Sequence, residues 1–173
     1  MKIFINPGHC VGADPGAVGN GLVEAEVALA IGKLVEKYLK AAGCETKLFQ
    51  FDGLRAIANE ANDWGADLFV SIHCNSAATA AANGTETFCW NGSAVGKKLA
   101  RCIQNQIVET LPLANRGIKT ANFAVLAYTN MPAVLVETAF IVNPYDAKLL
   151  KNNQDEFARA IARGVTDLAG CLE

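Results

Sequence analysis

The run Asp67-Leu-Phe-Val-Ser-Ile-His73 constrains the fold more than any other segment, because it is dense in apolar and β-branched residues. Such a run is typical of a strand buried on both faces, as found in parallel sheets covered by helices. Shorter strand-like runs accompany it at residues 2–6, 45–51, 84–90 and 133–137. We therefore expect a sheet with helices packed against it.

Helical periodicity fills the gaps between these runs. Apolar residues recur every three or four positions from Glu24 to Ala42, which predicts a helix that Gly43 ends. The same reasoning predicts helices over residues 54–64, 93–111, 144–150 and 153–170, and loops over 7–22, 75–83 and around Arg116-Gly117. Alternation of strands and helices predicts an α/β fold: a twisted, mostly parallel central sheet with helices on both faces.

The bulk composition fits one soluble domain. A length of 173 residues suits a single catalytic domain over 1–173, and 51% apolar residues with 18% charged ones are ordinary for a globular protein. The net charge of −2 argues against a nucleic-acid partner. No stretch is long enough to span a membrane or to serve as an export signal. We expect a monomer without a membrane partner.

The six cysteines do not indicate a disulfide framework. None of them forms a Cys-x-x-Cys pair, and most lie in apolar segments. A domain of this size forms a core without cross-links, so we expect free, mostly buried thiols.

Four side chains that can bind or activate a metal gather at predicted element ends. His9 follows the first strand, His73 and Glu137 end the two most apolar strands, and Glu24 opens the first long helix. Ligand sites in open α/β sheets form outside the carboxyl ends of the strands, so these residues are expected to converge. Two histidines and a carboxylate are a common catalytic zinc set, and a further carboxylate can move protons.

Each of these residues also has a structural interpretation. A single histidine at a strand end is more often a hydrogen-bonded structural residue, and an acid at a helix start commonly faces the helix dipole. On the residues alone Glu24 and Glu26 compete for one role. Glu137 is harder to explain structurally, because burying an acid among apolar neighbours is costly without a partner.

Four sequence blocks, spread over nearly the whole chain, resemble one known family. They are Asn6-Pro-Gly-His9 with Asp14-Pro-Gly-Ala17 and Gly21-Leu-Val-Glu24; Ala66-Asp-Leu-Phe-Val-Ser-Ile-His73; Arg116-Gly-Ile-Lys119 with Asn122-Phe123 and Val125-Leu126; and Met131-Pro-Ala-Val-Leu-Val-Glu137 with Phe140-Ile-Val-Asn143-Pro144. Together they are similar to the zinc-dependent N-acetylmuramoyl-L-alanine amidases of type 3, which are cell-wall hydrolases.

The resemblance implies cleavage of the amide between the lactyl group of N-acetylmuramic acid and L-alanine of the stem peptide. It implies His9, Glu24 and His73 as ligands of Zn²⁺, which favours Glu24 over Glu26, and Glu137 as the general base and acid that serves the zinc-activated water. The implied partner is peptidoglycan or a muropeptide, met either by a secreted domain or by a cytoplasmic endolysin released at lysis.

This chain departs from the family pattern at three positions. Asn6 replaces the usual acid before Pro-Gly-His, so we expect altered hydrogen-bond support of His9. Cys10 and Cys74 each follow an implied ligand directly; they could form a regulatory disulfide or compete for zinc, although packing away from the site is favoured.

Alternatives to the amidase interpretation stay open on the sequence alone. One is a zinc hydrolase or carboxypeptidase that acts on another amide. The other, from a different class, is a non-catalytic glycan-binding or zinc-storage domain.

Overall fold

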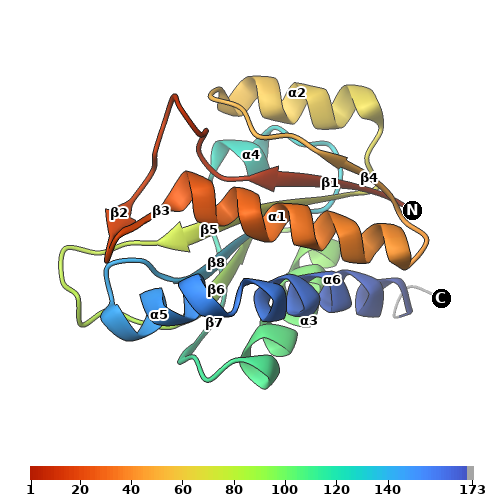
Figure 1. The fold of residues 1–173 in the computed structure, drawn as a ribbon. Helices are drawn as coiled ribbons and strands as arrows, with labels where there is room; N and C mark the ends of the chain where they lie inside the picture. Colours follow the sequence, from red (N-terminus) through yellow and green to blue (C-terminus); the bar gives the residue numbers. More distant parts are fainter. Residues whose placement is uncertain (171–173) are drawn as a thin grey trace.

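A six-stranded sheet runs through the middle of the protein (Figure 1). In the computed structural model, which describes residues 1–170, the strands follow the order β4 (Glu45–Leu48), β1 (Lys2–Pro7), β5 (Leu68–Asn75), β8 (Ala133–Phe140), β6 (Thr85–Cys89) and β7 (Asn115–Thr120). The first four are parallel, whereas β6 pairs antiparallel with β8 and parallel with β7. The predicted α/β fold with a mostly parallel sheet is confirmed.

Helices cover both faces of this sheet, as Figure 1 shows. One face carries the long helices α1 (Glu24–Ala41), α3 (Ala94–Thr110) and α6 (Gln154–Gly170). The other face carries the shorter α2 (Leu54–Trp64) and α4 (Ala124–Ala127). The remaining elements are α5 (Pro144–Asn152), which follows β8, and a small hairpin of β2 (Val18–Gly19) and β3 (Leu22–Val23).

The order of the strands places a ligand crevice between β1 and β5. The chain passes from β1 through α1 to β4 on one side, then returns through α2 to β5 on the other side of β1. Right-handed connections in opposite directions put α1 and α2 on opposite faces. The carboxyl ends of β1 and β5 therefore form the switch point at which open sheets bind ligands.

Side chains alternate between the two faces of the sheet along each strand, and this alternation determines on which face the polar residues lie. Ile3, Ile5 and their neighbours pack under α1 and α6, whereas Phe4, Phe69 and Leu135 pack under α2 and α4. His73 and Glu137 follow Phe69 and Leu135 at even spacing, so both lie on the α2 side of the sheet.

The structure corrects three predictions from the sequence. The segment around Arg116-Gly117 is the edge strand β7 and not a loop. The predicted loop over 7–22 contains β2 and the first residue of β3, which pair as a short hairpin with two residues in each strand. Strand β8 continues three residues past Glu137, to Phe140, so Glu137 lies within the strand and not at its end.

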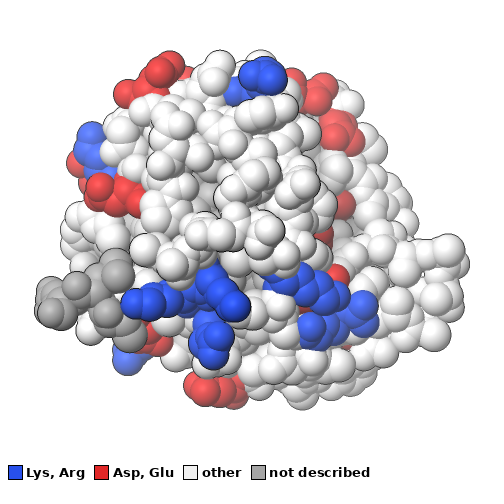
Figure 2. All heavy atoms as spheres, turned by 180° about the vertical axis from the view of Figure 1, so that it is seen from behind, with Lys and Arg blue, Asp and Glu red and all other residues white. Residues whose placement is uncertain are grey.

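Charge is distributed unevenly over the surface. Figure 2, the view from behind, shows Lys and Arg side chains in neighbouring groups across the lower half of this face, with most of the remainder uncharged.

No helix among residues 1–170 is long and apolar enough to cross a membrane.

Asp146 ties the end of β8 to the start of β6. Its side chain is 1% exposed, and Oδ2 accepts hydrogen bonds from the backbone N–H groups of Gly84 (2.7 Å) and Phe140 (3.0 Å). Asp146→Ala leaves both buried donors unsatisfied, so we expect the free energy of unfolding to fall by about 2–4 kcal/mol. Asp146→Asn keeps an acceptor oxygen and should cost less. Urea denaturation of both variants checks this, and equal losses would contradict the assignment.

Candidate metal centre

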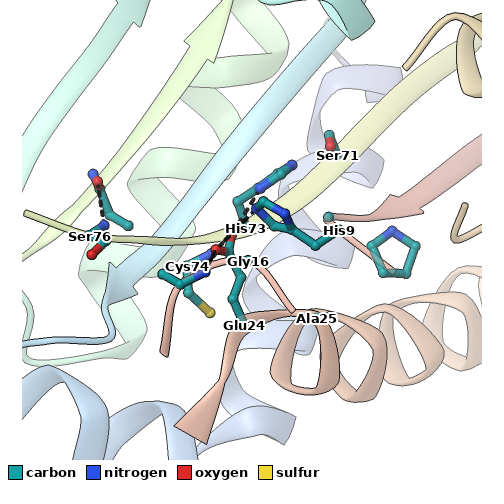
Figure 3. A network of polar contacts seen from close by, with 12 residues as sticks. His9, Gly16, Glu24, Ala25, Ser71, His73, Cys74 and Ser76 are labelled. Atoms are coloured by element: carbon teal, nitrogen blue, oxygen red, sulfur yellow. Dashed lines mark hydrogen bonds and ion pairs between the residues drawn. The ribbon is translucent and has the colours of Figure 1, made fainter. Parts of the chain in front are cut away.

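The buried carboxylate of Glu24 holds two imidazoles at the start of α1. Its Oε1 lies 2.9 Å from Nδ1 of His73, and its Oε2 lies 3.2 Å from Nε2 of His9 (Figure 3). One ligand atom from each of these three residues lies within 4.8 Å of the others. The structure thus brings His9, Glu24 and His73 together, and Glu26 is exposed on the opposite side of the helix turn.

Backbone donors fix the Glu24 carboxylate in place. Glu24 is only 3% exposed; Oε2 accepts from the N–H of Ala17 at 2.9 Å and Oε1 from that of Cys74 at 3.0 Å. Burial raises the pKa of Glu24, but the hydrogen bond and charge of His73 and the two backbone donors lower it overall. Glu24 is therefore held as a carboxylate.

Asp14 orients His9, a role that the sequence analysis did not assign. Oδ2 of Asp14 lies 2.7 Å from Nδ1 of His9, and Oδ1 accepts from the N–H of Gly16 at 3.0 Å. These hydrogen bonds lower the pKa of Asp14. With Nδ1–H donated to Asp14, the Nε2 atom of a neutral His9 ring presents its lone pair to the centre.

Asn6 does not support His9 through any hydrogen bond that the structure shows. Its amide donates to the carbonyls of Pro7 and Phe49, and its oxygen accepts from the hydroxyl of Ser71. The expected change in the support of His9 stays a prediction; the contacts of Asn6 join β1 to β5 and to the chain after β4.

Two glycines allow the imidazoles to approach the backbone. A Cβ atom on Gly8 would lie 2.3 Å from the ring of His73, and one on Gly16 would lie 2.5 Å from the ring of His9 and 2.7 Å from Oε2 of Glu24. His9 itself has φ +58°, which is uncommon for a residue with a side chain. Strained backbone of this kind persists where the surrounding contacts enforce it.

Glu137 lies next to the centre on the neighbouring strand. It is the register partner of His73 across β5 and β8, and its Oε2 is buried without a hydrogen-bond partner among the described residues. Burial, followed by the charges of Glu24 and Glu86, raises the pKa of Glu137 to about 8. A carboxyl group with such a pKa can both accept and release a proton near neutral pH.

Glu86 extends this row of polar residues by one strand, because it is the register partner of Glu137 across β8 and β6. Glu86 is 5% exposed, and its carboxylate contacts Nε of Arg116 at 3.0 Å, the Lys119 ammonium group, and Nδ2 of Asn75 at 2.7 Å. Burial raises its pKa, but these partners lower it overall. In the sequence, Glu86 alternates with Thr85 and Thr87, and this strand pattern could have indicated that Glu86 faces the same side of the sheet as Glu137.

The cysteines beside the ligands do not form a disulfide. Cys74 is 3% exposed, packs in the core under the long helices and directs its sulfur away from the imidazoles (Figure 3). Burial raises the pKa of its thiol far above the usual value. The prediction that the thiol packs away from the site is therefore confirmed for Cys74. It is not confirmed for Cys10, which is a half-buried free thiol in the loop. Cys44 and Cys89 are also free, and Cys171 lies outside the described residues.

Gly16→Ala should weaken metal binding about 10- to 100-fold, because the new methyl group displaces His9 and Glu24. Gly12→Ala is the matched control: Gly12 also has positive φ (+84°, against +67° for Gly16), but nothing lies within 4 Å of the added Cβ. Both variants carry similar backbone strain. Titration of the metal-free proteins with Zn²⁺ compares them, and equal affinities would contradict the close-approach argument.

The chain matches known proteins over nearly its full length. The family Amidase_3, described as N-acetylmuramoyl-L-alanine amidase, matches residues 3–167. The N-acetylmuramoyl-L-alanine amidase LytC of Bacillus subtilis (strain 168) is 44% identical over 170 residues, which cover 94% of this chain and 34% of LytC. The endolysin of Bacillus phage SPP1 is 34% identical over 173 residues, which cover 94% of this chain and 62% of the endolysin.

A solved structure agrees with these matches. The N-acetylmuramoyl-L-alanine amidase AmiC2 of Nostoc punctiforme superposes with a TM-score of 0.92 at 35% identity, covering 98% of this chain and 97% of the AmiC2 chain. This chain spans about a third of the length of LytC. From the family match over residues 3–167, the chain belongs to the N-acetylmuramoyl-L-alanine amidase family.

Proposed function

We propose that this chain is a zinc-dependent N-acetylmuramoyl-L-alanine amidase. It hydrolyses the amide between the lactyl group of N-acetylmuramic acid and L-alanine of the peptidoglycan stem peptide. The observation that carries the proposal is the convergence of His9, Glu24 and His73 beside a buried acid, Glu137, on the next strand. Membership of the amidase family supports the choice of substrate.

The three converging residues suit a zinc ion. Each of them offers one potential ligand atom, and these atoms all lie within 4.8 Å of one another. Nε2 of a neutral His9 and Oε2 of Glu24 are both acceptors and face each other, an arrangement that a cation stabilises. Two histidines and one glutamate match the three protein ligands that catalytic zinc sites commonly use. His9, Glu24 and His73 would hold the ion.

Zinc, when bound, would supply Lewis-acid polarisation of the amide carbonyl and a lower pKa for water at the site. Glu137 takes a proton from the attacking water and passes it to the alanine nitrogen as the C–N bond breaks. The surroundings of Glu137 suit both steps, because apolar burial and the nearby acids keep its proton affinity high. Asp14 keeps His9 in the tautomer that directs Nε2 to the centre.

The rest of the chain has a supporting role in this proposal. Residues 1–173 act as one catalytic domain and as a monomer, and the substrate is the bacterial cell wall or a soluble muropeptide cut from it. The relatives include a bacterial amidase and a phage endolysin, so both autolysis and host lysis fit the same chemistry.

Purified peptidoglycan treated with the zinc-loaded protein should yield new amino-terminal alanine, detected by labelling free amines and hydrolysing the products. Glu137→Gln keeps the size of the side chain but cannot accept the proton, so we expect turnover to fall at least about 100-fold. Its zinc content should equal that of the wild-type protein, because Glu137 is not among the three ligand residues.

The outcomes separate the alternatives. A zinc-loaded protein that releases other amines, or carboxyl-terminal residues, is a hydrolase of another specificity. Zinc binding without any product favours the non-catalytic interpretation. Full turnover by Glu137→Gln would refute the proton-transfer role.

A further inference from the structure

A cavity of about 290 Å³ opens beside the candidate metal centre. His9 and His73 form its inner wall, and the loop between β4 and α2, with Phe51 and Asp52, forms its outer wall. The volume equals that of about ten water molecules, so it has room for one group about the size of a sugar ring. A molecule that reacts at the centre therefore has space for one of its substituents here.

The position of Glu137 indicates which substituent this is. The cavity lies toward β1 and β4, whereas Glu137 lies on β8, on the other side of His73. Because Glu137 protonates the departing nitrogen, the peptide part of the substrate extends toward β8. The acyl part, which is the lactyl group with its sugar, then extends toward the cavity.

An aromatic platform lines the cavity. The side chain of Phe51 is 47% exposed and stacks on Phe49, with ring centroids 5.6 Å apart and planes at 22°. Phe49 in turn contacts the buried ring of Phe4 at 6.2 Å. Leu54 is 57% exposed on the same wall. Phe51 is therefore held against the core by other rings while one side of it stays open.

The charges on the two sides of the centre differ in sign. Asp14 and Asp52 line the cavity and offer acceptors, whereas on the other side the two cations Arg116 and Lys119 outnumber the one carboxylate, Glu86, that they contact. Stem peptides carry carboxylates, which the two aspartates repel. A neutral N-acetylated sugar has hydroxyl and amide donors for the aspartates and an apolar face for an aromatic ring.

We propose that this cavity binds the N-acetylmuramic acid ring of the substrate, with Phe51 as its stacking platform. The proposal rests on the proposed amidase function. It makes Phe51 a residue for sugar recognition, separate from the groups that hold zinc or move protons.

Two substrates test this: an N-acetylmuramoyl peptide, and the same peptide acylated with D-lactate alone. For the sugar-bearing substrate Phe51→Ala should raise KM about 10-fold with little change in kcat, because stacking is lost on binding. For the lactoyl peptide, KM and kcat of Phe51→Ala should equal those of the wild-type protein. Phe51→Trp should restore the KM of the sugar substrate. Trp90→Ala, an exposed aromatic at the far end of β6, should leave both substrates unaffected.

Circular dichroism and zinc content identify any variant that fails to fold. If Phe51→Ala does not fold, the KM values of Phe51→Trp and the wild type for the two substrates are compared instead. Equal effects of Phe51→Ala on both substrates, or no effect on either, would overturn the sugar site. If the wild-type protein releases alanine from neither substrate nor peptidoglycan, the proposed function fails instead.

Discussion

The contacts of the Glu24 carboxylate organise the whole candidate centre. One buried side chain joins the start of α1, the loop at Ala17, and the end of β5 through hydrogen bonds to Ala17, His73 and Cys74. A buried carboxylate without such partners would cost several kcal/mol. The loop between His9 and Glu24 must therefore close over the end of the sheet, which explains the positive φ of His9 and the absence of a side chain at Gly16.

Electrostatic asymmetry distinguishes the two acids at the centre. Glu24 receives hydrogen bonds from Ala17, His73 and Cys74, which lower its pKa, whereas Glu137 has a buried oxygen without a partner among the described residues and a pKa raised to about 8. Glu86, the next acid in the row, adds to the charge that raises the pKa of Glu137, but Arg116 and Lys119 neutralise Glu86 itself. One carboxylate is thus suited to hold a cation and the other to exchange a proton.

Much of this arrangement could be predicted from the sequence, for physical reasons that differ between residues. His9 and His73 follow apolar strands, and the rule that parallel strands end at one edge brings them together. Glu24 could not be separated from Glu26 by spacing, because both occupy the first turn of one helix; only the family resemblance favoured Glu24. The structure adds that Glu24 is buried and Glu26 is exposed.

The features that the sequence analysis missed depend on long-range contacts. The strand β7 lies at the sheet edge and has charged residues around Gly117, so it lacks the apolar alternation that marks a buried strand. Asp14 lies in a loop, where nothing local indicates that it meets His9. Cys74 packs inward as strand alternation predicts, whereas Cys10 lies outside any long strand and escapes that rule.

In the proposed centre, His9, Glu24 and His73 hold one zinc ion. Elemental analysis of the purified protein, after dialysis against zinc-free buffer, tests it most directly when His73→Ala is measured beside the wild type. We expect about one zinc per wild-type chain and a large loss in the variant, with both proteins folded by circular dichroism. A folded wild-type protein that takes up no zinc, or a variant that retains all of it, would contradict the account.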